Sequence, residues 1–260
     1  MIADALAGLN PIGTFPIYQL DQGQPFDLLA PYNLLGAIGY ALWLVAYVLV
    51  IRKGFKDKTY AIPLIPICLN FTWEFMDSWV LPDEVPFWKW VDRAWFILDV
   101  LILYQLFRFG RKEQRIPEIK RLYYPIVCVA LLLAFWGQYT FVTTFHDTLG
   151  FIAAFIINLV MSIIFPFFYF ARRDLHGLSW GAAWCKLFGT GLASIQCVFL
   201  FPKIHPLSPV AYSPLSPDSF FYFLFITIFL FDCVYVGLLW RARRRAKEGA
   251  GPPDPTASAA

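Results

Sequence analysis

Four acidic residues lie inside long apolar stretches of this 260-residue chain: Glu74, Asp77, Asp99 and Asp232. If the stretches cross a membrane, a charged side chain near the middle costs roughly 3 kcal/mol or more, so such residues usually face a cavity or a partner and are functional candidates. Asn70, Glu74 and Asp77 follow each other at helical intervals and share one helix face. Proton transfer is the chemistry that these groups could perform, because burial in an apolar site keeps a carboxyl group protonated.

Each acidic residue also has a structural interpretation. Asp77 lies close enough to the end of its apolar stretch to be solvated. Asp99 can accept hydrogen bonds from neighbouring helices as a packing device. Asp232 can form an ion pair with Lys186, which lies at a similar depth in another apolar stretch. For Glu74 the catalytic interpretation is favoured, because the amide one turn before it can tune a protonated acid.

Seven apolar runs must position these residues. Each has about the 20 residues that cross roughly 30 Å of hydrocarbon as a helix. They lie, within about three residues, at 32–51, 61–80, 90–109, 122–143, 149–171, 179–201 and 219–240. Hydrophobic residues make up 59% of the chain and charged residues 15%, against roughly 45–50% and roughly 25% in soluble domains. The sequence therefore predicts an all-α, polytopic membrane protein with seven transmembrane helices.

The predicted domain organisation is one membrane domain with two short flanks. Residues 1–31 form a lead-in, which is not a secretory signal peptide because it contains no Lys or Arg and is broken by three prolines. Residues 32–245 form the seven-helix domain. Residues 246–260 are small, polar and proline-rich, and we expect them to be disordered because they cannot bury enough apolar surface to fold.

Basic residues predict the orientation. Alternate loops, on one side of the predicted membrane, carry 17 of the 21 Lys and Arg residues. Loops rich in Lys and Arg stay in the cytoplasm, so the N-terminus is expected outside and the C-terminus in the cytoplasm. We expect an integral, multi-pass protein, in the cytoplasmic membrane if the chain is bacterial. The formal charge of +3 is too balanced to indicate a nucleic-acid partner.

The sequence lacks the residues that several common functions require. The last apolar run contains no lysine for a retinal Schiff base. The three histidines lie in separate loops without metal-ligand spacing, and no DDxxD cluster or phosphate-binding glycine loop occurs. The five cysteines include no CxxC pair. We therefore expect neither a metal site nor a cofactor.

Three features occur together: the seven runs, the sequence NFTWEF in the second, and Asp232 followed by Tyr235 in the last. Their combination resembles the integral-membrane terpene cyclases of the pyripyropene and paxilline pathways, whose bacterial relatives cyclise farnesylated indoles, including those of drimentine biosynthesis. Trp95 and Asp99 in the third run also match the family pattern. The resemblance covers the seven-helix region and implies that Glu74 and Asp232 are essential acids.

The implied reaction makes physical sense for these residues. Cyclising a prenyl chain without a diphosphate leaving group requires protonation of an alkene or an epoxide. Glu74 is the candidate proton donor and Asp232 assists or receives a proton, with supporting polar groups at Asn70, Asp77, Asp99 and Tyr235. The carbocation needs a dry cavity with aromatic faces, each worth roughly 0.5–2 kcal/mol. The candidate lining residues, which could instead face lipid, are Phe71, Trp73, Trp95, Trp184 and Phe229.

The sequence thus predicts a membrane-bound terpene cyclase that acts on the farnesyl-type chain of a prenylated aromatic or indole metabolite. Its expected partners are this small molecule and the lipid bilayer. A proton-coupled small-molecule transporter is the first alternative, because buried carboxyl groups and an aromatic cavity would suit it equally. The chain shows no inverted repeat and no paired Gly/Pro breaks, which disfavours it. A structural or assembly subunit is the second alternative, disfavoured because such proteins rarely keep several unpaired acids in the membrane.

Overall fold

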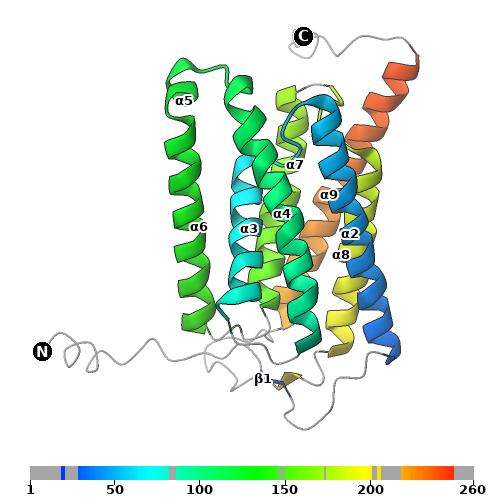
Figure 1. Ribbon diagram of the computed structural model, residues 1–260. Coiled ribbons are helices and arrows are strands. Elements are labelled where there is room, and N and C mark those ends of the chain that lie inside the picture. The colour runs from blue at the N-terminus through cyan, green and yellow to red at the C-terminus, as the bar shows by residue number, and fades with distance from the viewer. Residues whose placement is uncertain are drawn as a thin grey trace, which may run out of the picture.

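The computed structural model describes residues 19–20, 29–81, 86–145, 147, 150–172, 174–200, 204–205 and 218–248. In these residues the chain forms seven long helices that run side by side, and a short helix at one end of the bundle (Figure 1). The helices are α2 (Pro31–Asp57), α3 (Leu64–Trp79), α4 (Pro86–Glu113), α5 (Pro117–Arg121), α6 (Tyr123–Phe145), α7 (Phe151–Arg172), α8 (Trp180–Leu200) and α9 (Asp218–Lys247). Two antiparallel two-residue strands, β1 (Gln19–Leu20) and β2 (Ile204–His205), lie at the other end of the bundle.

Each of the seven predicted runs coincides with one long helix, so the all-α prediction is confirmed for the described part of the chain. Five helices are long and apolar enough to cross a membrane: α2, α6, α7, α8 and α9. The helix α3 has 16 residues, about 24 Å at 1.5 Å per residue, which is shorter than a typical hydrocarbon core. The helix α4 has charged residues near both ends. The count of seven spans and the orientation therefore stay predictions.

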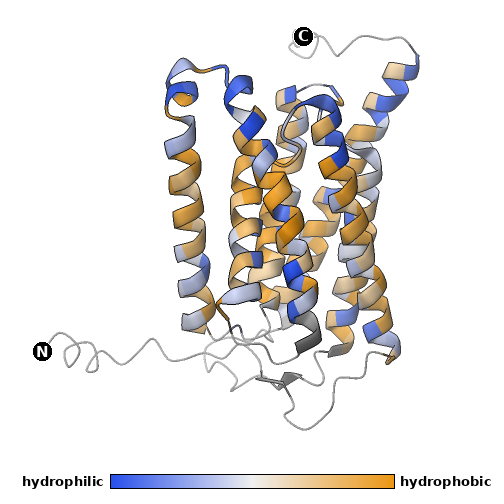
Figure 2. Cartoon of the chain, viewed as in Figure 1, coloured by the Kyte–Doolittle hydropathy of each residue, from blue (hydrophilic) through white to orange (hydrophobic). Residues whose placement is uncertain are grey.

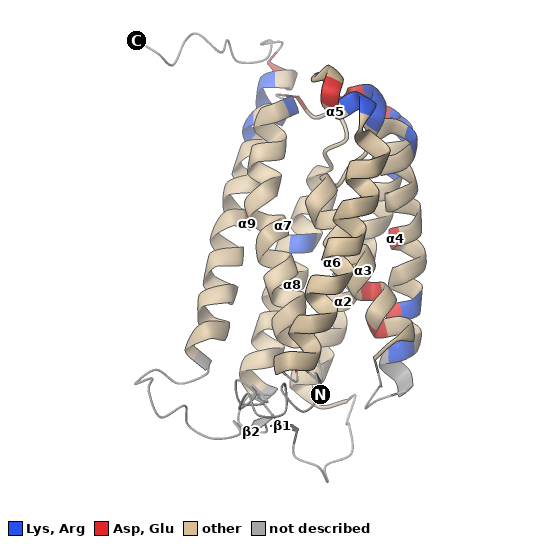
Figure 3. Cartoon of the chain, turned by 90° about the vertical axis from the view of Figure 1, so that its left-hand side faces the viewer, with Lys and Arg blue, Asp and Glu red and all other residues tan. Residues whose placement is uncertain are grey.

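The distribution of side chains along the bundle is uneven. Apolar residues cover the middle of the helices (Figure 2). Lysine and arginine residues gather at the end of the bundle where α2, α4, α7 and α9 finish (Figure 3). We call this the basic end, and the predicted topology would place it in the cytoplasm. Most of the lead-in and of the C-terminal tail lies outside the described residues.

The closest helix packing joins α2 to α8. A Cβ atom added to Gly39 would lie 2.7 Å from the carbonyl oxygen of Gly189, and one added to Gly189 would lie 2.8 Å from that of Gly39. No real side chain fits at such distances, so both positions require glycine. Small residues let membrane helices approach closely. This contact brings the middle of α2, with Trp43 and Tyr47, next to Lys186 of α8.

The main hydrophobic core contains buried side chains from all seven long helices. It includes buried side chains from α2, α3, α4, α7 and α9, such as Tyr47, Ile67, Leu106, Phe165 and Tyr235.

Candidate active site

The first buried polar cluster lies between α2, α3 and α4. The Asn70 amide nitrogen donates hydrogen bonds to Asp99 Oδ2 at 2.6 Å and to the hydroxyl oxygen of Tyr47. Glu74, one turn after Asn70, is 7% exposed, and Asp99 is fully buried. The carboxyl group of Glu74 lies within electrostatic range of Asp99, Asp92 and Asp77. We call Tyr47, Asn70, Glu74 and Asp99 the acid cluster.

The acid cluster contains no basic side chain. Among the described residues, no salt bridge involves Glu74 or Asp99. The second carboxyl oxygen of Asp99, Oδ1, is buried and has no hydrogen-bond partner there. Burying a carboxylate without a partner is expensive, whereas a protonated carboxyl group is far easier to bury. The geometry therefore suits acids that hold protons.

The second buried cluster lies between α7, α8 and α9. Lys186 Nζ lies 2.6 Å from Asp232 Oδ1 and 2.7 Å from Asp232 Oδ2, and it donates a further hydrogen bond to Ser162 Oγ at 2.6 Å. All three side chains are buried. The structure thus shows the ion pair that the sequence allowed as one interpretation of Asp232. We call these three residues the ion-pair cluster.

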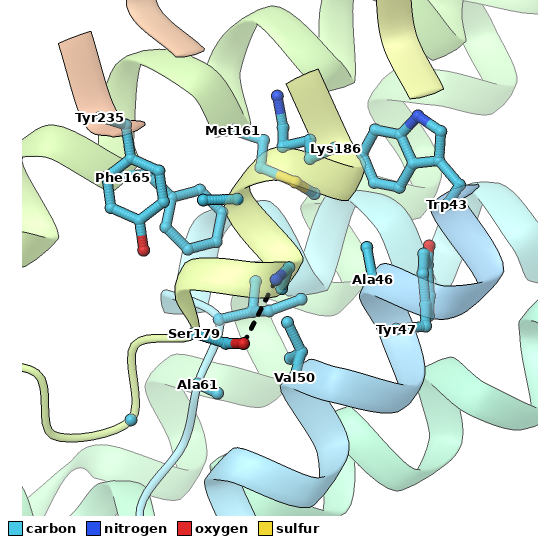
Figure 4. Close-up of a pocket in the computed structure, with 14 residues that line it drawn as sticks. Trp43, Ala46, Tyr47, Val50, Ala61, Met161, Phe165, Ser179, Lys186 and Tyr235 are labelled. Atoms are coloured by element: carbon cyan, nitrogen blue, oxygen red, sulfur yellow. Dashed lines mark hydrogen bonds between the residues drawn. The ribbon is translucent and has the colours of Figure 1, made fainter. Parts of the chain in front are cut away.

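A pocket lies between the two clusters. It is partly open to the surroundings and is lined by α2, α7, α8, α9 and the α2–α3 and α7–α8 loops. Tyr47 of the acid cluster lines it on one side, and Lys186 of the ion-pair cluster lines it on another (Figure 4). Neither Glu74 nor Asp232 is a lining residue. Each acid therefore meets this pocket only through a neighbour.

Aromatic side chains form much of the pocket wall. Trp43 is held in place because its indole N–H donates to Thr190 Oγ1 at 3.2 Å. Its ring lies 6.1 Å from that of Tyr47 and 5.7 Å from Lys186 Nζ. Phe165 lies across the pocket from Trp43 (Figure 4). Such faces suit a cationic intermediate.

The sequence did not lead us to predict that Trp43 and Tyr47 line the pocket. The available signal was their spacing of four residues, which puts them on one face of α2. Gly39 and Gly36 lie one and two turns before Trp43 on nearly the same face, and they indicate which side of α2 packs against another helix.

The five aromatic residues predicted from the sequence lie elsewhere. None of them lines the pocket. Phe71 contacts Phe96, Trp95 contacts Tyr40, and Trp184 contacts Trp180 and Phe188. Trp73 is buried against Gly150, and Phe229 is 53% exposed. Of the predicted polar residues, Asn70 and Asp99 belong to the acid cluster with Glu74, Asp77 lies one turn after Glu74 on α3, and Tyr235 lines the pocket.

Hydrogen bonds from Arg172 stabilise the loops at the basic end of the pocket. The Arg172 guanidinium donates to Thr59 Oγ1, to the Tyr60 carbonyl oxygen, to Glu113 Oε2 and to the His176 carbonyl oxygen, at distances of 2.7–3.0 Å. It therefore ties the α2–α3 loop to the α7–α8 loop, and both loops line the pocket. Within the described ranges, no group of three or more His, Cys, Asp or Glu residues is placed to hold a metal ion.

Comparison with known proteins gives a consistent result. Residues 26–245 match the family model of the Pyr4-like transmembrane terpene cyclases. Terpene cyclase macJ of Penicillium terrestre is 30% identical over 174 residues, which cover 63% of this chain and 64% of macJ. The Pyr4-family terpene cyclase mfmH of Annulohypoxylon moriforme is 26% identical over 230 residues, covering 85% and 89%. Terpene cyclase dpasB of Apiospora sacchari is 25% identical over 220 residues, covering 83% and 86%. No solved structure matches the chain.

Proposed function

Because the chain belongs to the Pyr4-like transmembrane terpene cyclase family, we propose that it cyclises the farnesyl-type chain of a prenylated aromatic or indole metabolite in a proton-initiated, metal-independent reaction. Family membership confirms the resemblance inferred from the sequence. One observation supports the proposed reaction. An apolar pocket with aromatic walls lies between the acid cluster, which contains no cation, and the ion-pair cluster, in which the Asp232 carboxylate is paired with Lys186. The relatives described above are all named terpene cyclases, so the transporter alternative gains no support.

Glu74 is the proposed proton donor. Because Glu74 does not line the pocket, the proposal requires the reacting end of the prenyl chain to extend past Tyr47 to this acid. The carboxyl proton is then transferred to an alkene carbon or to an epoxide oxygen, which generates positive charge on the prenyl chain. Ring closure follows as alkene electron pairs form carbon–carbon bonds, and loss of one proton from carbon forms the final alkene. The proton gained equals the proton lost, so the product is an isomer of the substrate. Tyr47 lines the pocket and accepts a hydrogen bond from Asn70, which lies one turn before Glu74 on α3.

Asp232 is proposed to assist as an anion. A carboxylate whose two oxygens both accept from an ammonium group has no proton to give. The assisting role therefore suits it better than that of initiating acid. Its negative charge also balances Lys186, whose positive charge would otherwise oppose a carbocation in the pocket.

Purified protein in detergent or liposomes tests the proposal. It is incubated with farnesylated phenolic and indole acceptors, with and without their terminal epoxides, and the products are analysed by mass spectrometry and NMR. We expect a cyclic product of unchanged mass, formed equally well in EDTA. A requirement for magnesium, or a product that differs in mass from its substrate, would contradict the proposed reaction. The heat-denatured protein is the control.

A further inference from the structure

Tyr235 has a hydroxyl group without a partner. The residue is 5% exposed, and its ring lies 5.0 Å from that of Phe165. No residue in the described ranges forms a hydrogen bond with its hydroxyl group. The buried Tyr123 differs, because its hydroxyl group donates to the carbonyl oxygen of Leu106 at 3.0 Å. The Tyr235 hydroxyl oxygen is not one of the sealed, unpaired polar atoms of the core, so it is accessible and free to bind a ligand.

The position of this hydroxyl group suggests where such a ligand would lie. Tyr235 lines the pocket, and Figure 4 shows its hydroxyl group directed toward the end of the pocket where Ser179 lies. Ser179 Oγ accepts a hydrogen bond from the Ala182 amide at 3.2 Å at the start of α8. Its own hydroxyl proton has no acceptor among the described residues. Two hydroxyl protons without acceptors therefore lie at the same end of a largely apolar pocket.

We propose that Tyr235 and Ser179 bind an oxygen atom on the head group of the prenylated substrate and thereby determine which head groups the protein accepts. The inference rests on the proposed function. Two hydroxyl protons without acceptors call for a ligand atom that accepts hydrogen bonds, such as a phenol, enol or carbonyl oxygen. An indole N–H is only a donor: it can bond to a hydroxyl oxygen, but it would leave both hydroxyl protons without an acceptor. The site therefore favours an oxygenated head group over an indole.

The site also sets the direction of the substrate. With its head group at the basic end, the prenyl chain extends along Phe165 and Met161 toward Trp43 and Lys186, which line the pocket farther from Ser179 (Figure 4). The walls in that direction are aromatic and aliphatic, apart from the Lys186 side chain, whose ammonium group is neutralised by Asp232. The polar and apolar parts of the pocket thus match the polar and apolar parts of a prenylated phenol.

A pair of probes that differ by one oxygen atom tests the proposal: 2-farnesylphenol and farnesylbenzene. Their dissociation constants are measured from the concentration dependence of the rise in Tm that each causes in the solubilised full chain. We expect wild-type protein to bind the phenol about 2- to 10-fold more tightly, the effect of one or two neutral hydrogen bonds. Tyr235→Phe should remove this preference, and Ser179→Ala should reduce it.

Stability separates a binding role from a structural one. Tyr235→Phe keeps the ring against Phe165 and removes a hydroxyl group that bonds nothing in the free protein, so the Tm without ligand should not fall. The matched control is Tyr123→Phe, which breaks the bond to Leu106 and should lower the Tm while leaving the preference for the phenol intact. A Tm for Tyr235→Phe as low as that for Tyr123→Phe would overturn the proposal.

The remaining outcomes are equally decisive. The inference is wrong if wild-type protein binds neither probe or binds both equally, or if Tyr235→Phe keeps the full preference. Binding is measured without turnover, so it is independent of the proposed reaction. A protein that cyclises no prenylated compound but shows a Tyr235-dependent preference would refute the cyclisation and leave the binding site. A protein that cyclises its substrate but shows no such preference would refute the binding site and leave the proposed cyclisation.

Discussion

The acid cluster and the ion-pair cluster use the same kind of side chain in opposite ways. Asp99 accepts one hydrogen bond from a neutral amide and has a buried oxygen without a partner among the described residues. Asp232 has both oxygens within 2.7 Å of an ammonium group. Both residues are buried to a similar degree. The partner, rather than the depth of burial, therefore distinguishes a carboxyl group that can hold a proton from one that cannot.

In the proposed reaction, this difference would give the first and the last step each a suitable carboxyl group. A donor must remain protonated until the substrate arrives, which favours a site without cations. The anion that balances charge later must stay ionised, which favours a lysine beside it. The bundle separates the two requirements by placing them on different helices, α3 and α4 against α8 and α9.

The largest expected effect concerns the donor. Glu74→Gln keeps the shape and most of the hydrogen bonding but removes the acidic proton, so turnover should fall by about 10²- to 10⁴-fold. The Tm should stay close to that of the parent, because an acid that is already neutral is replaced by a neutral amide. Steady-state assays and thermal unfolding in detergent measure the two quantities. Glu118→Gln in the short helix α5 is the matched control and should alter neither. Normal turnover in Glu74→Gln would remove the proposed donor.

Breaking the ion pair between Asp232 and Lys186 should lower the stability of the fold. Asp232→Asn leaves the Lys186 ammonium group buried without its counter-ion, which should cost roughly 3–5 kcal/mol of folding free energy. Replacing Lys186 with Met in the same chain removes the stranded charge and should restore the Tm. Thermal unfolding of the two single variants and the double variant measures this.

Activity of the double variant then decides the role of Asp232. A folded but inactive Asp232→Asn/Lys186→Met protein would show that the carboxylate takes part in the reaction. Recovery of turnover together with stability would show that the pair only maintains the packing of α7, α8 and α9. Ser162→Ala removes one hydrogen bond from Lys186 without changing the charges, and it serves as a milder control.

A smaller effect is expected at the link between the acid cluster and the pocket. Asn70→Leu removes the donor to Asp99 and Tyr47 at similar side-chain size. Leaving these buried groups unpaired should lower the folding free energy by about 1–3 kcal/mol. Turnover should also fall, because the position of Tyr47 and the environment of Glu74 both change. Chemical or thermal unfolding with parallel assays measures these losses. Unaltered stability would contradict the hydrogen bonds described for Asn70.

The smallest effect tests the choice of aromatic residues. Trp43→Leu should lower turnover by roughly 2- to 30-fold, which corresponds to the loss of about 0.5–2 kcal/mol of cation–π stabilisation. Trp184→Leu is the matched control, because Trp184 was predicted to line the cavity but contacts Trp180 and Phe188 instead. Its turnover should remain within about twofold of the parent. The opposite ranking of the two variants would favour the sequence-based lining over the observed pocket.

The sequence alone determined where the helices lie and which acids they carry. All seven apolar runs correspond to helices, because the length of a run and its composition are local properties of the chain. The helical spacing of Asn70 and Glu74 also placed them on one face of α3 without any tertiary information. The ion pair of Asp232 could be named from the sequence only as one of two interpretations.

Tertiary structure decided which side chains meet. Lys186 and Asp232 are 46 positions apart, and only the packing of α8 beside α9 brings their charges together. The pocket is lined by Trp43 and Tyr47, whereas Trp184 and Phe229 lie outside it. The physical reason is that lipid is as apolar as the interior of a helix bundle. A hydrophobic pattern therefore does not distinguish the lipid-facing side of such a helix from its buried side, and the rotation of each helix is fixed only by its neighbours.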